Sequence, residues 1–202
     1  HSSGAAQAGL AHVLAAKGHA ADAQELFTKA GESLRAEGHE VRAIEAQSNV
    51  GCMLYAQNLF AQAAEVFERT LPQRREHGDT SGQTLDLLNL ASCRVGLGDP
   101  TSALPLFTEA IPLQDAGGDA LGAAKTRLDL GNATYQTGDT RAAIAHYQAA
   151  LAVLTPHLVP IEAAQVHSNL GSMLYEVGEV ATAQEAFDTA ERLLPKEDPQ
   201  AL

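Results

Sequence analysis

Four polar residues stand at equal 40-residue intervals: Asn49, Asn89, Asp129 and Asn169. Asparagine is a mediocre helix former, so helix propensity does not explain this column. A side-chain amide both donates and accepts hydrogen bonds, which suits the N–H and C=O groups of an extended peptide backbone. The chemistry that this spacing indicates is hydrogen bonding to a peptide segment.

Residues three and four positions away share the helical face of this column. We predict that they complete a groove, and the further groove residues are Glu45, Lys125, Ser92, Asn132, Ser172, Tyr55, Tyr135 and Tyr175. Tyrosine offers flat, amphipathic surface of the kind enriched at binding hot spots. A structural role is the alternative. In that case the asparagines would hydrogen-bond between adjacent helices, and the tyrosines would be half-buried.

The elements that position these side chains are set by a 40-residue period that runs through the whole chain. Leucine or valine recurs at 10, 50, 90, 130 and 170, and Gly or Ala follows at the next position each time. An aromatic residue stands at 27, 67, 107, 147 and 187. A fixed period of this size predicts a solenoid, in which each unit buries its apolar face against its neighbours.

Within each unit the apolar spacing is helical, and it predicts two antiparallel helices of about 16–17 residues. The turn inside a unit falls at Gly18, Asn58, Gly98, Gly138 or Gly178. A left-handed residue is favoured just after a helix at such a turn. We call the Gly and Ala residues at 11, 51, 91, 131 and 171 the small column. Their small side chains let the paired helices approach closely, so Gly131→Leu should overpack the interface.

The order aliphatic, small, Leu/Tyr, Gly, Ala, aromatic, Ala resembles the tetratricopeptide repeat (TPR). The fifth unit shows it with Asn169-Leu170-Gly171, Leu174-Tyr175, Gly178, Ala183, Phe187, Ala190 and Pro195. The 40-residue period is similar to the long repeats of the Pins/LGN polarity adaptors and, more distantly, of kinesin light chains. The resemblance implies an all-α fold, a right-handed α-solenoid of five helix-turn-helix repeats. It also implies that the Asn column holds a partner's backbone, as in related adaptors.

We expect the repeats at about residues 5–39, 40–79, 80–119, 120–159 and 160–195. Residues 1–4 look like a tag remnant, so the array would be cut from a longer protein, and 196–202 form a polar tail. Pro72, Pro105 and Pro112 fall inside second helices and should bend them.

Composition narrows the function classes. The formal net charge is −12, which disfavours nucleic acid and anionic membranes as ligands. Arg74-Arg75 is the one basic doublet and is interpreted as a solvated helix end. No apolar run is long enough to insert into a membrane. Cys52 and Cys93 are expected to be reduced packing residues, which favours a cytoplasmic location.

The sequence gives an enzyme little support. Its histidines fall mostly at turns and helix ends, without metal-ligand spacing, so we predict no catalytic residues, no metal and no cofactor. Lys125 is the single base on the predicted groove, which disfavours a free acidic C-terminus and favours a neutral to mildly basic protein or peptide segment. We therefore expect a protein–protein interaction adaptor or scaffold. The alternative is a structural spacer or a self-associating segment, with Leu85 and Leu88 at the interface.

Overall fold

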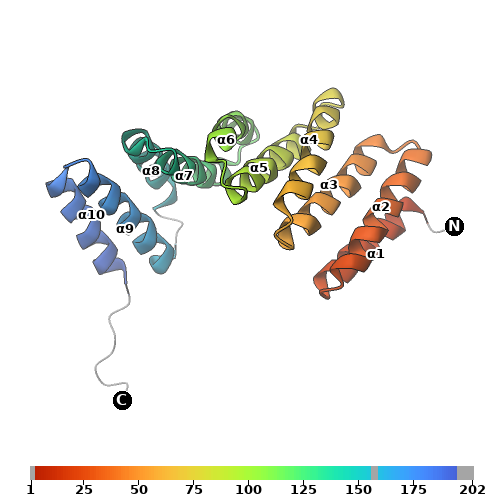
Figure 1. Cartoon of the computed structure of the whole chain (residues 1–202), viewed down its shortest axis with the longest axis horizontal. Helices are drawn as coiled ribbons and strands as arrows, with labels where there is room; N and C mark the ends of the chain where they lie inside the picture. The colour runs from red at the N-terminus through yellow and green to blue at the C-terminus, as the bar shows by residue number, and fades with distance from the viewer. Residues whose placement is uncertain (1–2, 156–158, 195–202) are drawn as a thin grey trace, which may run out of the picture. The chain divides into compact units, whose positions relative to one another are not determined.

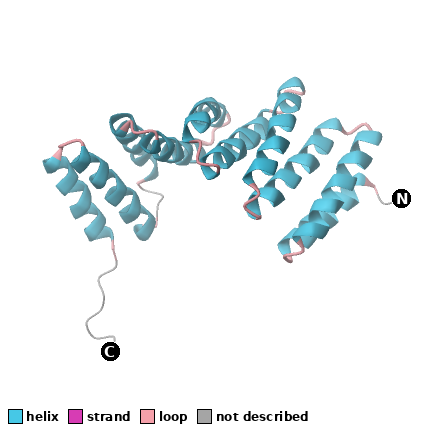
Figure 2. Cartoon of the chain, viewed as in Figure 1, coloured by secondary structure: helices cyan, strands magenta, loops and turns pink. Residues whose placement is uncertain are grey.

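The computed structural model describes residues 3–155 and 159–194, and within these ranges it contains ten α-helices and no strand (Figures 1 and 2). The helices are α1 Gly4–Ala16, α2 Ala20–Ala36, α3 Glu40–Ala56, α4 Phe60–Glu76, α5 Thr80–Gly96, α6 Pro100–Ala116, α7 Ala120–Gln136, α8 Thr140–Leu154, α9 Pro160–Glu176 and α10 Val180–Leu193. The predicted all-α class with five helix-turn-helix repeats is confirmed.

Short turns connect the helices, and each predicted intra-repeat turn is found. Gly18 has φ of 84° and Asn58 has φ of 60°, so both are left-handed, as expected of the residue that ends a helix. Asparagine is the side chain that tolerates this conformation best. Asp79, Asp119 and Asp139 cap the helices that follow them by accepting a hydrogen bond from a backbone N–H. At these three positions a left-handed glycine ends one helix, and the aspartate directly after it begins the next.

The chain divides into two compact units, one up to Leu113 and the other from Gln114 onward. In unit 1, α2 packs on both α1 and α3, and α4 packs on both α3 and α5. In unit 2, α7 packs on α8 and α9 packs on α10, while α8 also contacts α9.

The cores show why the small column faces the aromatic column. A Cβ atom added to Gly51 would lie 2.7 Å from the Phe67 ring, and one added to Gly131 would lie 2.7 Å from the Tyr147 ring. Real Cβ atoms essentially never approach a ring so closely. The close approach predicted for this column is therefore confirmed in both units.

The interior prolines do not interrupt their helices. The helices α4 and α6 run through Pro72, Pro105 and Pro112 without a break, so any bend there stays a prediction. Ser3 caps α1, whose first residue is Gly4. Residues 1–2 of the expected tag remnant and the expected tail at 196–202 lie outside the described residues.

The basic doublet Arg74-Arg75 is only partly solvated. Arg75 is exposed, as expected of a solvated helix end, but Arg74 is only 5% exposed. Its guanidinium forms ion pairs with Asp79 and with Asp86, which is 1% exposed. The interpretation of Arg74 as solvated is wrong, because the acid that pairs with it comes from the next helix, twelve residues away.

Candidate functional site

The predicted groove residues all lie on first helices of the repeats. In unit 1 they are Glu45, Asn49 and Tyr55 on α3 with Asn89 and Ser92 on α5, and in unit 2 they are Lys125, Asp129, Asn132 and Tyr135 on α7 with Asn169, Ser172 and Tyr175 on α9. None of them is buried: Asn49, Asn89, Ser92 and Asn169 are half-buried, and the others are exposed. Each unit thus presents these columns on adjacent helices with their side chains reachable from solvent.

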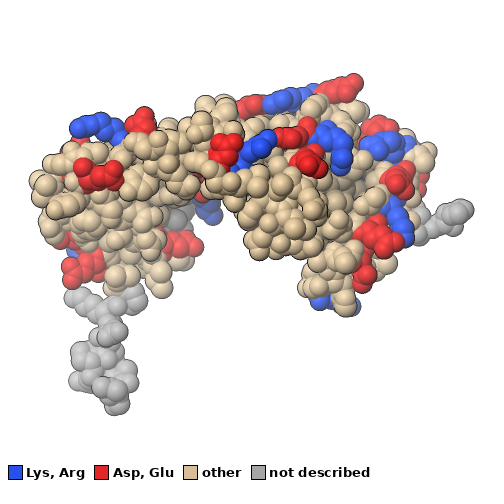
Figure 3. Space-filling view, viewed as in Figure 1, with Lys and Arg blue, Asp and Glu red and all other residues tan. Residues whose placement is uncertain are grey.

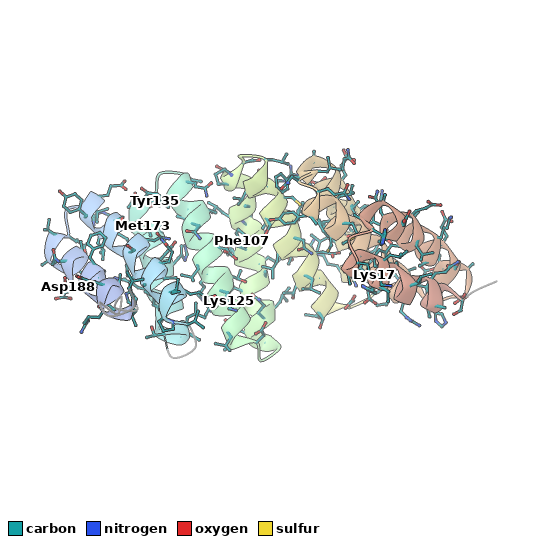
Figure 4. The ribbon with its side chains drawn as sticks, turned by 90° about the horizontal axis from the view of Figure 1, so that it is seen from below. Lys17, Phe107, Lys125, Tyr135, Met173 and Asp188 are labelled. Carbon is teal, nitrogen blue, oxygen red and sulfur yellow. The ribbon has the colours of Figure 1, made fainter. Side chains whose placement is uncertain are left out.

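A cavity of about 220 Å³ opens between α7 and α9 of unit 2. Its lining is Asn132, Tyr135, Tyr147, Asn169, Ser172 and Met173, four of which are predicted groove residues. Figure 4 labels Tyr135 and Met173 on neighbouring helices, with Lys125 toward the other end of α7. Met173 is 4% exposed and forms an apolar part of the wall.

The polar side chains of this cavity form a chain of hydrogen bonds. Gln165 Nε2 donates to Asn169 Oδ1 at 2.9 Å, and Asn169 Nδ2 donates to the Tyr147 hydroxyl at 3.4 Å. The Tyr147 hydroxyl donates to Asn132 Oδ1. Two predicted groove residues, Asn132 and Asn169, are therefore connected through Tyr147 of the aromatic column.

Tyr147 was not among the predicted site residues. The residue is 2% exposed, as the core column requires, while its side chain reaches the cavity. Burial raises its pKa, so the hydroxyl is protonated at neutral pH and able to donate. The signal that could have found it is that the other four residues of the aromatic column are phenylalanine.

Acidic groups border the cavity. The Tyr135 hydroxyl donates to Glu176 Oε2 at 2.9 Å, and Thr140 donates to Glu176 Oε1 at 3.0 Å. The Glu176 carboxylate in turn raises the pKa of Tyr135. One turn before Asn132 on the same helix, the pKa of Asp129 is raised because neighbouring atoms displace water from its carboxylate. Across the described residues, Asp129 forms no ion pair with a Lys or Arg side chain.

Unit 1 holds a second cavity, between α1 and α3, also of about 220 Å³. Glu45 and Asn49 line it together with His12, whose position is one period before Cys52. Farther along the unit, Asn89 Nδ2 contacts Cys52 Sγ at 3.7 Å, and Ser92 donates to the backbone carbonyl of Leu88. The unit 1 asparagines thus lie at a cavity or on a sulfur atom.

The two cysteines are free thiols. Burial raises the pKa of the Cys52 thiol and raises that of Cys93 to about 11. Both thiols are therefore protonated at neutral pH, and a thiol is a poor nucleophile in that form.

Among the residues that the structure describes, no group of three or more His, Cys, Asp or Glu side chains could hold a metal ion. The helices found in the same ranges are each too short or too polar to cross a membrane. On the face in Figure 3, Lys and Arg side chains are interspersed with Asp and Glu rather than gathered in a cluster.

Comparison with known sequences identifies the repeat. Two family models, each described as tetratricopeptide repeat, match residues 83–155 and 128–200. No curated protein sequence matches the chain.

Solved structures share the fold at low sequence identity. MamA 41-end from Desulfovibrio magneticus RS-1 is 20% identical with a TM-score of 0.74, and the match covers 94% of each chain. YrrB, described as a TPR protein with an unusual peptide-binding site, is 20% identical with a TM-score of 0.69, over 95% of this chain and 86% of YrrB. A Podosopora anserina putative kinesin light chain with TPR-like repeats is 14% identical with a TM-score of 0.73, over 93% of each chain. With ten helices in five hairpins and matches of both kinds, the chain carries tetratricopeptide repeats and has the α-solenoid fold of TPR proteins.

Proposed function

We propose that the chain is an adaptor or scaffold module that holds an extended or helical peptide segment of a partner protein along the first helices of its repeats. The observation that supports it best is that none of the twelve predicted groove residues is buried, while each unit has a cavity that some of them line. The TPR fold supports a protein–protein interaction module in general, and we infer that the predicted groove is its binding surface.

The charge of the groove favours a neutral to mildly basic segment. The acids on or near the groove face, Glu45, Asp129 and Glu176, outnumber the bases Arg42 and Lys125, in a chain of net charge −12. Electrostatic attraction of this kind accelerates association and is screened by salt. We therefore expect binding to weaken as the salt concentration is raised. The 40-residue period and the Asn column are the features by which this chain resembles the Pins/LGN adaptors.

The test selects binders from a displayed library of short random peptides on the wild-type protein. Their affinity is then measured for the double variant Asn89→Ala, Asn169→Ala. The matched control is Gln62→Ala, Gln148→Ala, which removes two exposed amides from second helices, α4 and α8. We expect the first variant to lose binding with an unchanged melting temperature and the control to keep binding.

Two results would contradict the proposal. A melting temperature lowered by the asparagine replacements alone, with the remaining folded protein binding normally, would assign those side chains a structural role. Failure of every selected peptide to depend on the asparagines would move the binding surface elsewhere.

The second candidate is a self-associating spacer, which the exposure of Leu85 favours. Its side chain on α5 is 59% exposed. A light-scattering mass of one chain at all concentrations would reject this candidate, whereas a dimer that Leu85→Ser dissociates would support it.

A further inference from the structure

We propose that the cavity between α7 and α9 selects a neutral peptide group of its ligand, and that Tyr147 is the positioning residue that sets this selectivity. The inference rests on the proposed function, because it names the chemical group that one part of the groove recognises. It also adds a residue that lies in the core column rather than among the groove columns.

The hydrogen-bond chain has one direction. Asn169 Oδ1 already accepts from Gln165, so the amide nitrogen of Asn169 faces the Tyr147 hydroxyl. A hydroxyl carries a single proton, and that of Tyr147 is donated to Asn132 Oδ1. The amide nitrogen of Asn132, which is an exposed residue lining the cavity, is then the free end of the chain. It presents N–H donors, and donors and acceptors in such a chain polarise one another.

The surroundings decide which acceptor fits these donors. A carboxylate would be repelled by Glu176 and by Asp129, whose charge has no basic partner in the described part of the chain. A cation would be attracted by these acids, but a guanidinium or ammonium group has no acceptor to offer the Asn132 N–H groups. A neutral peptide group meets both demands, since its C=O accepts from Asn132 and its N–H can be directed at Glu176.

The size of the cavity agrees with a single peptide residue. Its volume of about 220 Å³ is below the roughly 300–1,000 Å³ typical of sites for whole small ligands. Met173 and the tyrosine rings supply apolar wall for the chain atoms on either side of the peptide group.

Unit 1 supplies an internal reference, because two of the three residues found two periods earlier differ. Where unit 2 has Asn132, Tyr147 and Asn169, the α3–α5 region of unit 1 has Cys52, Phe67 and Asn89. Without the hydroxyl, the Asn89 amide contacts the Cys52 sulfur directly. Phenylalanine is thus an accepted residue at this position of the fold, which makes Tyr147→Phe a mild substitution.

The first part of the experiment needs no ligand. Side-chain amide resonances of Asn132 and Asn169 are recorded by NMR for the wild type, for Tyr147→Phe and for the control Tyr55→Phe, which removes a hydroxyl from α3 in the other unit. We expect both asparagine resonances to shift in Tyr147→Phe only, at an unchanged melting temperature. Unshifted resonances in Tyr147→Phe would overturn the role of Tyr147.

The second part titrates the wild type with N-methylacetamide, acetamide, acetate and guanidinium, and follows the Asn132 side-chain amide. We expect N-methylacetamide to shift this resonance most, and its apparent affinity to fall several-fold in Tyr147→Phe. A larger response to acetate or guanidinium, or none to N-methylacetamide, would overturn the selectivity. A larger response to acetamide would overturn the assignment to backbone by indicating a side-chain amide. These outcomes are separable from the proposed function, since selected peptides that depend on Asn89 and Asn169 would still support a groove.

Discussion

The helices α3–α5 of unit 1 and α7–α9 of unit 2 have the same repeat geometry but different polar chemistry. On the groove face, unit 2 has a chain of three hydrogen bonds from Gln165 to Asn132, whereas unit 1 has an exposed leucine, Leu85, in the column of Gln165. Between the hairpins, by contrast, unit 1 has polar residues where α8 and α9 of unit 2 have apolar ones. Unit 1 buries Arg74 against Asp86 and Ser48, while the corresponding residues of unit 2 on α8 and α9 include Leu154 and Val166.

The difference shows that the period fixes where a side chain lies and leaves its chemistry free. The ion pair of unit 1 is buried and incompletely satisfied, because Asp86 Oδ1 has no hydrogen-bond partner in the described structure. Burial raises the pKa of Asp86 despite the nearby Arg74. One period after Arg74 and Asp86 the corresponding residues are Gln114 and Thr126, which are polar but uncharged. Thr126 donates to Gln114 Oε1 at 2.9 Å. Polar groups between the hairpins thus contribute to how they pack, and those on the predicted groove face are reachable from solvent.

The largest effect is expected from Arg74→Leu. This change leaves the buried Asp86 carboxylate without its cation, and breaking a buried pair costs about 3–5 kcal/mol. Urea unfolding measures the loss. The double variant Arg74→Leu, Asp86→Val installs the residues found at 154 and 166, and it should regain stability to within about 1 kcal/mol of the wild type. A double variant as unstable as the single one would show that the Leu and Val found at 154 and 166 of unit 2 cannot replace Arg74 and Asp86 in unit 1.

Leucine at the small column should destabilise both units alike. The added side chain of Gly51→Leu meets Phe67 and that of Gly131→Leu meets Tyr147, in both cases from a Cβ at 2.7 Å. Overpacking costs about 1–3 kcal/mol, and hydrogen exchange should show faster opening of the affected unit. An unchanged melting temperature for either variant would count against the shared geometry, and Gly131→Ala serves as the graded control.

The stability of unit 1 should carry a pH dependence that Asp86→Asn removes. The folded pKa of Asp86 is raised, so the folded chain holds this proton more tightly than the unfolded chain does. Its contribution to stability is therefore complete below the ordinary Asp pKa and is lost as pH rises through the raised pKa; one pKa unit corresponds to ~1.4 kcal/mol. Urea midpoints measured from about pH 3 to pH 7 should fall for the wild type relative to the variant. The opposite slope would mean that the pairing with Arg74 outweighs burial.

The smallest effect is expected from Tyr135→Phe in unit 2. The hydrogen bond to Glu176 is exposed and screened by water, so its loss should lower the free energy of unfolding only slightly. The control is Tyr55→Phe in unit 1, one of the corresponding tyrosines, whose ring packs on Phe60 with centroids 5.3 Å apart. Removing that hydroxyl should leave stability unchanged. Equal losses for the two variants would indicate that the Glu176 contact contributes nothing specific.

The amino-acid sequence was sufficient to predict the helices, their turns and the close approach of paired helices at the column of Gly and Ala. These features depend on spacing and local propensity, and both are visible in one chain. It also placed the twelve groove residues on first helices, because positions three and four apart share a face.

Only the tertiary structure decided the roles of Tyr147 and Arg74. Tyr147 occupies a core column, and nothing in its spacing reveals that its hydroxyl lies between asparagines 15 and 22 residues away. Arg74 occupies a helix end, where a basic side chain is usually solvated, but packing brings Asp86 of the next helix against it. Both roles arise from contacts between helices, whose side-chain partners the repeat pattern does not specify.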